Sequence, residues 1–132
     1  MMRNRTEEFL IAQDPAIVRD TRHAVRRLCQ DVDLAADTCE TAVLLASETV
    51  TNAIVHGAPP ARLVIQVSPE GIRVEVSDGT TLPPVVVAAR PDATSGRGIG
   101  LIDILATRWG VQPHASGKTV WFEIAPVPQP TS

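Results

Sequence analysis

Two groups of residues early in the sequence have types and spacings that suit the binding of a phosphorylated ligand. Glu48, Asn52 and His56 recur every four residues, so on a helix they would lie along one stripe and face the same ligand. A carboxylate can accept a proton from a hydroxyl group or water, and a carboxamide oxygen suits Mg²⁺. The same spacing also fits a solvated helix face, and His56 fits the end of a helix.

The second group is the pair Asp78 and Gly79, which follows a segment of alternating apolar and polar residues. A carboxylate at the end of a strand can accept a hydrogen bond from a ligand amine, and glycine permits close approach of the backbone. Asp-Gly is also a common turn. The pair therefore fits both a binding site and an ordinary connection.

A glycine-rich run, Ser95-Gly96-Arg97-Gly98-Ile99-Gly100-Leu101, leads directly into an apolar helical segment. Free amides at a helix N-terminus attract anions, which favours phosphate binding. The run is neither a dinucleotide fingerprint nor the phosphate loop of nucleoside triphosphatases, because it lacks the preceding strand of the former and the lysine and hydroxyl of the latter. A flexible hinge is the alternative. Near the end, Thr119 of Gly117-Lys118-Thr119 either reaches back toward the site or begins a hairpin strand.

Hydrophobic spacing and turn residues predict the elements that must position these groups. We expect an α+β fold, a two-layer sandwich in which helices cover one face of a mostly antiparallel sheet. Residues 1–132 form a single predicted domain with a frayed, proline-rich tail from about residue 125, and the long connection from Asp78 to Arg97 is predicted to be a lid or partner loop. The predicted strands are 6–11, 62–67, 72–77, 109–112 and 119–124, and the predicted helices are 15–30, 34–55 and 99–106.

Composition narrows the classes of function. The formal net charge of -3 gives no general attraction to nucleic acid. The sequence has neither the apolar core of a signal peptide nor a run long enough to span a membrane, so we expect a cytoplasmic protein. Cys29 and Cys39 match neither a disulfide framework nor a paired metal-ligand spacing, and are predicted to be reduced thiols in the core.

Taken together and in this order, the motifs resemble the ATPase fold shared by gyrase, heat-shock chaperones, histidine kinases and mismatch-repair proteins. They are Glu48-x-x-x-Asn52-Ala53-x-x-His56-Gly57, Val76-Ser77-Asp78-Gly79, Gly96-Arg97-Gly98-Ile99-Gly100-Leu101 and Gly117-Lys118-Thr119-Val120-Trp121-Phe122. The short length and the ending from Arg-Trp-Gly to Lys-Thr-Val-Trp-Phe-Glu are similar to the small anti-sigma-factor serine/threonine kinases. The resemblance covers about residues 16–124.

That resemblance implies an ATP site with Mg²⁺. Glu48 would be the general base, Asn52 would hold the Mg²⁺ that accompanies ATP, and Asp78, with Gly79 beside it, would bind the adenine amino group. Thr119 would support the adenine end. The phosphates would be cradled by the loop residues Gly96, Arg97, Gly98, Ile99 and Gly100.

The reaction implied by the resemblance is phosphoryl transfer from ATP to an anti-anti-sigma factor, with a sigma factor held in a competing complex. The protein partners are thus a sigma factor and its antagonist, and a homodimer is compatible with the resemblance. The sequence departs from the family pattern after Asp78, where Gly79-Thr80-Thr81 replaces Asp-x-Gly-x-Gly. The alternative is an ATP-binding regulator that sequesters a partner without phosphoryl transfer. A histidine kinase fragment is disfavoured because no phosphoacceptor helix precedes the domain in this sequence.

Overall fold

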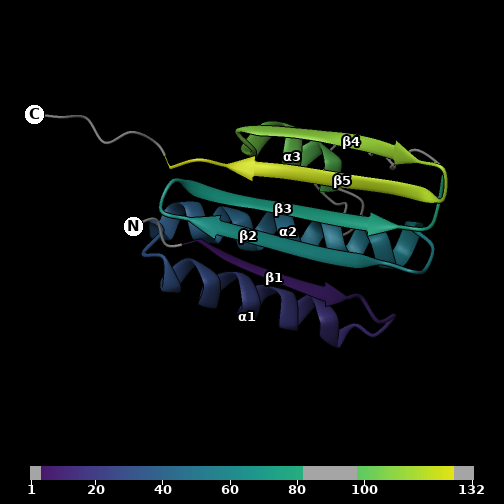
Figure 1. The fold of residues 1–132 in the computed structure, drawn as a ribbon, viewed down its shortest axis with the longest axis horizontal. Helices are drawn as coiled ribbons and strands as arrows, with labels where there is room; N and C mark the ends of the chain where they lie inside the picture. Colours follow the sequence, from purple (N-terminus) through teal and green to yellow (C-terminus); the bar gives the residue numbers. More distant parts are fainter. Residues whose placement is uncertain (1–3, 82–97, 127–132) are drawn as a thin grey trace, which may run out of the picture.

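The computed structural model describes residues 4–81 and 98–126, and Figure 1 shows their arrangement as one sheet with helices behind it. The strands are β1 (Arg5–Leu10), β2 (Arg62–Ser68), β3 (Gly71–Asp78), β4 (Arg108–His114) and β5 (Gly117–Ile124). The helices are α1 (Ala16–Asp31), α2 (Ala36–His56) and α3 (Gly98–Leu105).

All five strands form one sheet in the order β1-β2-β3-β5-β4, and every neighbouring pair is antiparallel. This confirms the predicted α+β class. The predicted elements are all present, with ends that differ by at most two residues. The last two strands are longer than predicted because they pair along their whole length, from Arg108 opposite Glu123 to His114 opposite Gly117. The greater part of the predicted lid, residues 82–97, and the tail from 127 lie outside the described residues.

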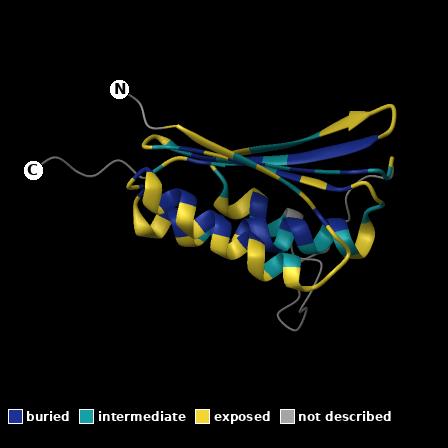
Figure 2. Ribbon diagram, turned by 60° about the horizontal axis from the view of Figure 1, so that its bottom comes forward, coloured by how far each residue is buried: buried dark blue, intermediate teal, exposed yellow. Residues whose placement is uncertain are grey.

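The core lies between the sheet and the helix layer, where the buried faces of both meet in Figure 2. In β3 the side chains of Ile72, Val74 and Val76 are buried and alternate with half-buried Arg73 and Glu75, as expected of a sheet with one covered face. From β5, Phe122 is fully buried on the same side. The helix α2 supplies an apolar stripe that includes fully buried Leu45, Ala46 and Val50.

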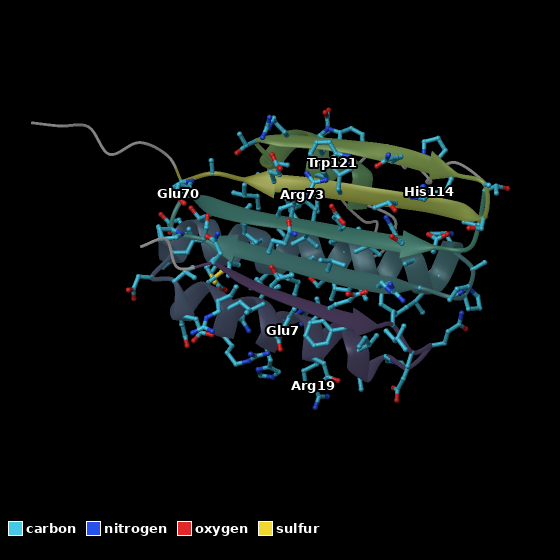
Figure 3. The ribbon with its side chains drawn as sticks, in the orientation of Figure 1. Glu7, Arg19, Glu70, Arg73, His114 and Trp121 are labelled. Atoms are coloured by element: carbon cyan, nitrogen blue, oxygen red, sulfur yellow. The ribbon has the colours of Figure 1, made fainter. Side chains whose placement is uncertain are left out.

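The opposite face of the sheet carries polar groups. Arg73 lies over the ring of Trp121 at 4.4 Å from its centroid, and Figure 3 shows the two side chains together. Trp121 in turn lies against Gly110 of β4, where a Cβ would come within 2.8 Å of the indole nitrogen. The strands β1 and β4 form the two edges of the sheet. Among the described residues, no helix is long and apolar enough to cross a membrane.

Candidate functional site

The helix α2 carries the first two predicted site residues, Glu48 and Asn52. Both are half-buried, at the margin of the apolar stripe that packs on the sheet. Within the part of the chain that the structure describes, neither side chain forms a hydrogen bond or ion pair. His56 is exposed as the last residue of the helix, which is the placement expected of a helix-end residue.

Asp78 ends β3 with its side chain pointing into the helix side of the sheet, where 5% of it is exposed. Its carboxylate accepts hydrogen bonds from Lys118 Nζ, at 3.0 Å to Oδ2 and 3.2 Å to Oδ1. The backbone N–H of Thr80 donates to Oδ1 at 2.8 Å. Charge-assisted bonds of this kind fix a carboxylate in one orientation. The Asp78 carboxylate is therefore held rigidly at the end of a buried strand.

Glycines bring the end of α2 and the start of β5 against Asp78. A Cβ on Gly57, the residue that follows α2, would lie 2.8 Å from the Asp78 carboxylate. A Cβ on Gly117 would overlap the Asp78 carbonyl group, and one on Gly79 would lie 2.5 Å from the Pro59 carbonyl oxygen. Only glycine permits backbone segments to approach this closely. Asp78 and Gly79 are thus enclosed by two segments that are distant from them in the sequence, residues 57–59 and the start of β5.

Thr119 lies on the other face of the sheet from the Asp78 side chain. Its hydroxyl group is hydrogen-bonded to Ser77 Oγ at 2.8 Å and to His114 Nε2 at 2.8 Å. Because side chains alternate along a strand and Lys118 is the direct partner of Asp78 in the ladder, Lys118 and not Thr119 lies beside the Asp78 side chain. The predicted strand began at residue 119, and Lys118 was not among the predicted site residues.

The glycine-rich run is described only from Gly98 onward. Gly98, Ile99 and Gly100 form the first turn of α3, whose leading N–H groups have no partners within the helix. Fully buried Ile102 anchors this helix, and α3 packs against α2, which in turn packs against β3. Gly96 and Arg97 lie outside the described residues. The site residues that the structure describes therefore come from elements that contact one another.

Among the cavities lined by the described residues, two lie at opposite ends of the sheet. The larger, of about 500 Å³, includes Glu70 and Arg73 and none of the predicted site residues. A smaller one, of about 240 Å³, includes Asp78, Lys118 and His114. Figure 3 shows Glu70 and His114 at the two ends. Of these two cavities, the smaller one contains the buried Asp78–Lys118 pair. The described residues contain no cluster of three or more His, Cys, Asp or Glu side chains suited to a metal ion.

Comparison with known proteins supports the same fold. Residues 11–124 match the family described as "Histidine kinase-like ATPase domain". No curated protein matches the sequence. A solved structure, that of the RsbU and RsbW domains of Rv1364c from Mycobacterium tuberculosis, superposes with a TM-score of 0.70 at 16% identity. The match covers 92% of this chain but only 32% of that one. On the family match over most of its length, the chain belongs to the histidine kinase-like ATPase domain family.

Proposed function

We propose that the protein is an ATP-binding regulator of the anti-sigma-factor serine/threonine kinase type. The observation that carries this proposal is the buried Asp78 carboxylate at the junction of α2, β3 and β5. It is an acceptor fixed in one orientation, as the recognition of a base amino group requires. The likeness to a structure containing an RsbW domain supports the narrower assignment to partner switching.

The chemical groups of the proposed site residues match the parts of ATP that they would bind. Asp78 would accept from the adenine amino group beside Gly79, and the first-turn amides of α3 would face the phosphates, which helix N-termini attract. Asn52 offers a carboxamide oxygen for Mg²⁺, a cation that favours oxygen ligands and keeps several waters. Bound Mg-ATP would supply the transferable phosphoryl group. Gly96 and Arg97 complete the phosphate loop in this proposal.

Glu48 is proposed as the general base for the hydroxyl group of the acceptor protein. It lies one turn before Asn52 on α2, is half-buried, and has no ion-pair partner among the described residues. Its carboxylate can accept the proton of a serine or threonine as phosphoryl transfer proceeds, while positioning and charge neutralisation supply most of the catalysis. The acceptor would be an anti-anti-sigma factor, and the competing partner a sigma factor in the cytoplasm.

The first test is calorimetric titration of Mg-ATP into the purified protein and into Asp78→Asn. Asp20→Asn is the matched control, because Asp20 is exposed on α1. We expect wild type and the control to bind alike and Asp78→Asn to bind at least about 10-fold more weakly, the loss typical of a hydrogen bond to a charged group. A folded wild type that binds no Mg-ATP would refute the proposal.

A second experiment separates the kinase from a regulator that only sequesters its partner. Glu48→Ala should retain Mg-ATP binding and lose transfer of labelled phosphate to the anti-anti-sigma factor. If wild type binds Mg-ATP but transfers no phosphate, and Glu48→Ala regulates equally well, the sequestering regulator is the correct function. The sequence departs from the family pattern at Gly79-Thr80-Thr81, and there the Thr80 N–H donates a hydrogen bond to Asp78 Oδ1. This bond occupies one acceptor position of the carboxylate that is proposed to bind adenine.

A further inference from the structure

Lys118 is the only lysine in the sequence, and it is buried. Its side chain is 8% exposed and its ammonium group is paired with the Asp78 carboxylate. Other cationic side chains that the structure describes in ion pairs are arginines, each at least 30% exposed. The only lysine side chain of the sequence thus lies against Asp78, the carboxylate that is proposed to recognise the ligand.

Stability alone does not account for this pair. Removing two charges from water is costly, and well-packed apolar residues in place of a buried ion pair often give an equally stable protein. The neighbours of the pair are apolar positions of the same sheet face, with Val76 preceding Asp78 by two residues and Val120 following Lys118 by two. A further apolar pair would continue that pattern. The charged pair is better explained by what it presents to a ligand.

The hydrogen bonds between Lys118 and Asp78 leave one acceptor position of Asp78 and one N–H donor of Lys118 unused. An ammonium group has three N–H donors, and two of them are used by Asp78 Oδ1 and Oδ2. Thr80 N–H also donates to Oδ1, whereas Oδ2 has Lys118 as its single hydrogen-bond partner among the described residues. The residue that approaches Oδ2 from the end of α2 is Gly57, which has no side chain to cover that atom. A lone pair of Oδ2 and the third N–H of Lys118 thus remain side by side.

We propose that Lys118 is a positioning residue that sets the base selectivity of this site. It fixes the orientation of the Asp78 carboxylate through its hydrogen bonds to both oxygens, and adds a donor beside them. A 6-aminopurine presents the complementary order, a donor amino group next to the acceptor N1, whereas a 6-oxopurine presents an acceptor next to a donor. The inference rests on the proposed function, because it concerns how that same site chooses its nucleotide.

The test compares Mg-ATP, Mg-ITP and magnesium tripolyphosphate as ligands of wild type, Lys118→Met and Lys118→Arg. ITP carries the 6-oxo edge, and tripolyphosphate has no base. Arg22→Met is the control for loss of a positive charge, because Arg22 is exposed on α1. Circular dichroism and thermal melting establish that each variant is folded.

We expect Lys118→Met to weaken Mg-ATP binding by about 10- to 100-fold, the equivalent of one hydrogen bond to a charged group. Binding of Mg-ITP and tripolyphosphate should change little, so the preference for ATP over ITP falls. Lys118→Arg, which keeps the charge, should restore most of the preference, and Arg22→Met should leave it unchanged. A folded Lys118→Met with the wild-type preference would overturn the inference and leave ATP binding intact. A wild type that binds no ATP would remove the proposed function as well.

A measurement on wild type covers the case in which Lys118→Met does not fold. Labelling lysine with ¹⁵N at the side-chain nitrogen gives one signal, because Lys118 is the only lysine. Mg-ATP should shift that signal, and magnesium tripolyphosphate should not, since it does not reach the base end of the site. An Nζ signal unchanged by saturating Mg-ATP would show that Lys118 does not face the base.

Discussion

Replacement of Gly57 by alanine should damage the fold and the site together. Gly57 has a φ of -89°, which any residue can adopt, so the effect rests on contacts alone. The new methyl group would lie 2.5 Å from the Ala53 carbonyl oxygen and 2.8 Å from both Cγ and Oδ2 of Asp78, whereas ordinary contact begins at 3.4 Å. The Ala53 oxygen belongs to the last turn of α2 and accepts from Gly57 N–H, so it cannot move away without breaking that turn.

The magnitude follows from the cost of overpacking, about 1–3 kcal/mol where the neighbours must shift. Because one of the neighbours is backbone and the other a paired buried carboxylate, we expect a loss of about 2 kcal/mol in the free energy of unfolding. In a domain of this size that lowers Tm by roughly 5–10 °C. The change should also displace the Asp78 carboxylate and weaken Mg-ATP binding by the folded protein.

Thermal melting and Mg-ATP titration of Gly57→Ala measure the two effects, with Gly71→Ala as the matched control. A Cβ at Gly71 would likewise lie 2.5 Å from a carbonyl oxygen, that of Ile124, but at the opposite end of β3. The control should be destabilised at least as much, since Gly71 also has a φ of 150°, yet bind Mg-ATP normally when folded. If Gly57→Ala is as stable as wild type, or binds Mg-ATP as Gly71→Ala does, the described packing against Asp78 is refuted.

Three further predictions concern the core and the open sheet face. Phe122→Ala, at a fully buried position, should lower the free energy of unfolding by about 3–5 kcal/mol in chemical denaturation; a loss below about 1 kcal/mol would contradict its place in the core. Burial, aided by a hydrogen bond with Cys39, raises the pKa of the Cys29 thiol, so iodoacetamide at neutral pH should leave Cys29 unmodified until denaturant is added; rapid alkylation of the native protein would argue against it. Although desolvation opposes it, hydrogen bonding to Arg73 and Arg108 lowers the pKa of the Glu123 carboxyl. At pH values above 4.5, the ordinary pKa of this group, wild type should therefore be more stable than Glu123→Gln. The difference should shrink as the pH falls below 4.5 and vanish below the lowered value, whereas a difference that is constant between pH 7 and pH 2 would exclude an electrostatic origin.

The fold was predictable because its signals are local. Alternation in β3 and helical spacing in α2 identify which faces are apolar. Two helices with an apolar face each, together with several alternating strands, leave few ways to bury those faces. The positions of Glu48 and Asn52 follow from the helix period alone. That both residues lie along the same side of α2 could therefore be predicted without any knowledge of the sheet.

The partner of Asp78 could not be predicted in the same way, because it depends on the register of two strands 40 residues apart. The strand that carries Lys118 begins at Gly117, through pairing with His114, two residues before the predicted start. An apolar pattern cannot identify that start, since a buried lysine interrupts it. Alternation counted back from buried Phe122 and Val120 would have placed residue 118 on the covered face and Thr119 on the open one.

The two edge strands determine how this sheet can meet other chains. On β4, Pro113 has no backbone N–H to offer to an added strand, and on β1 the exposed positions include the charged residues Arg5 and Glu8. Both devices discourage edge-to-edge association. Neither edge is thus a good template for β-strand addition. A second protein would have a more favourable route to this one through its helices or the open face of the sheet than by extending the ladder.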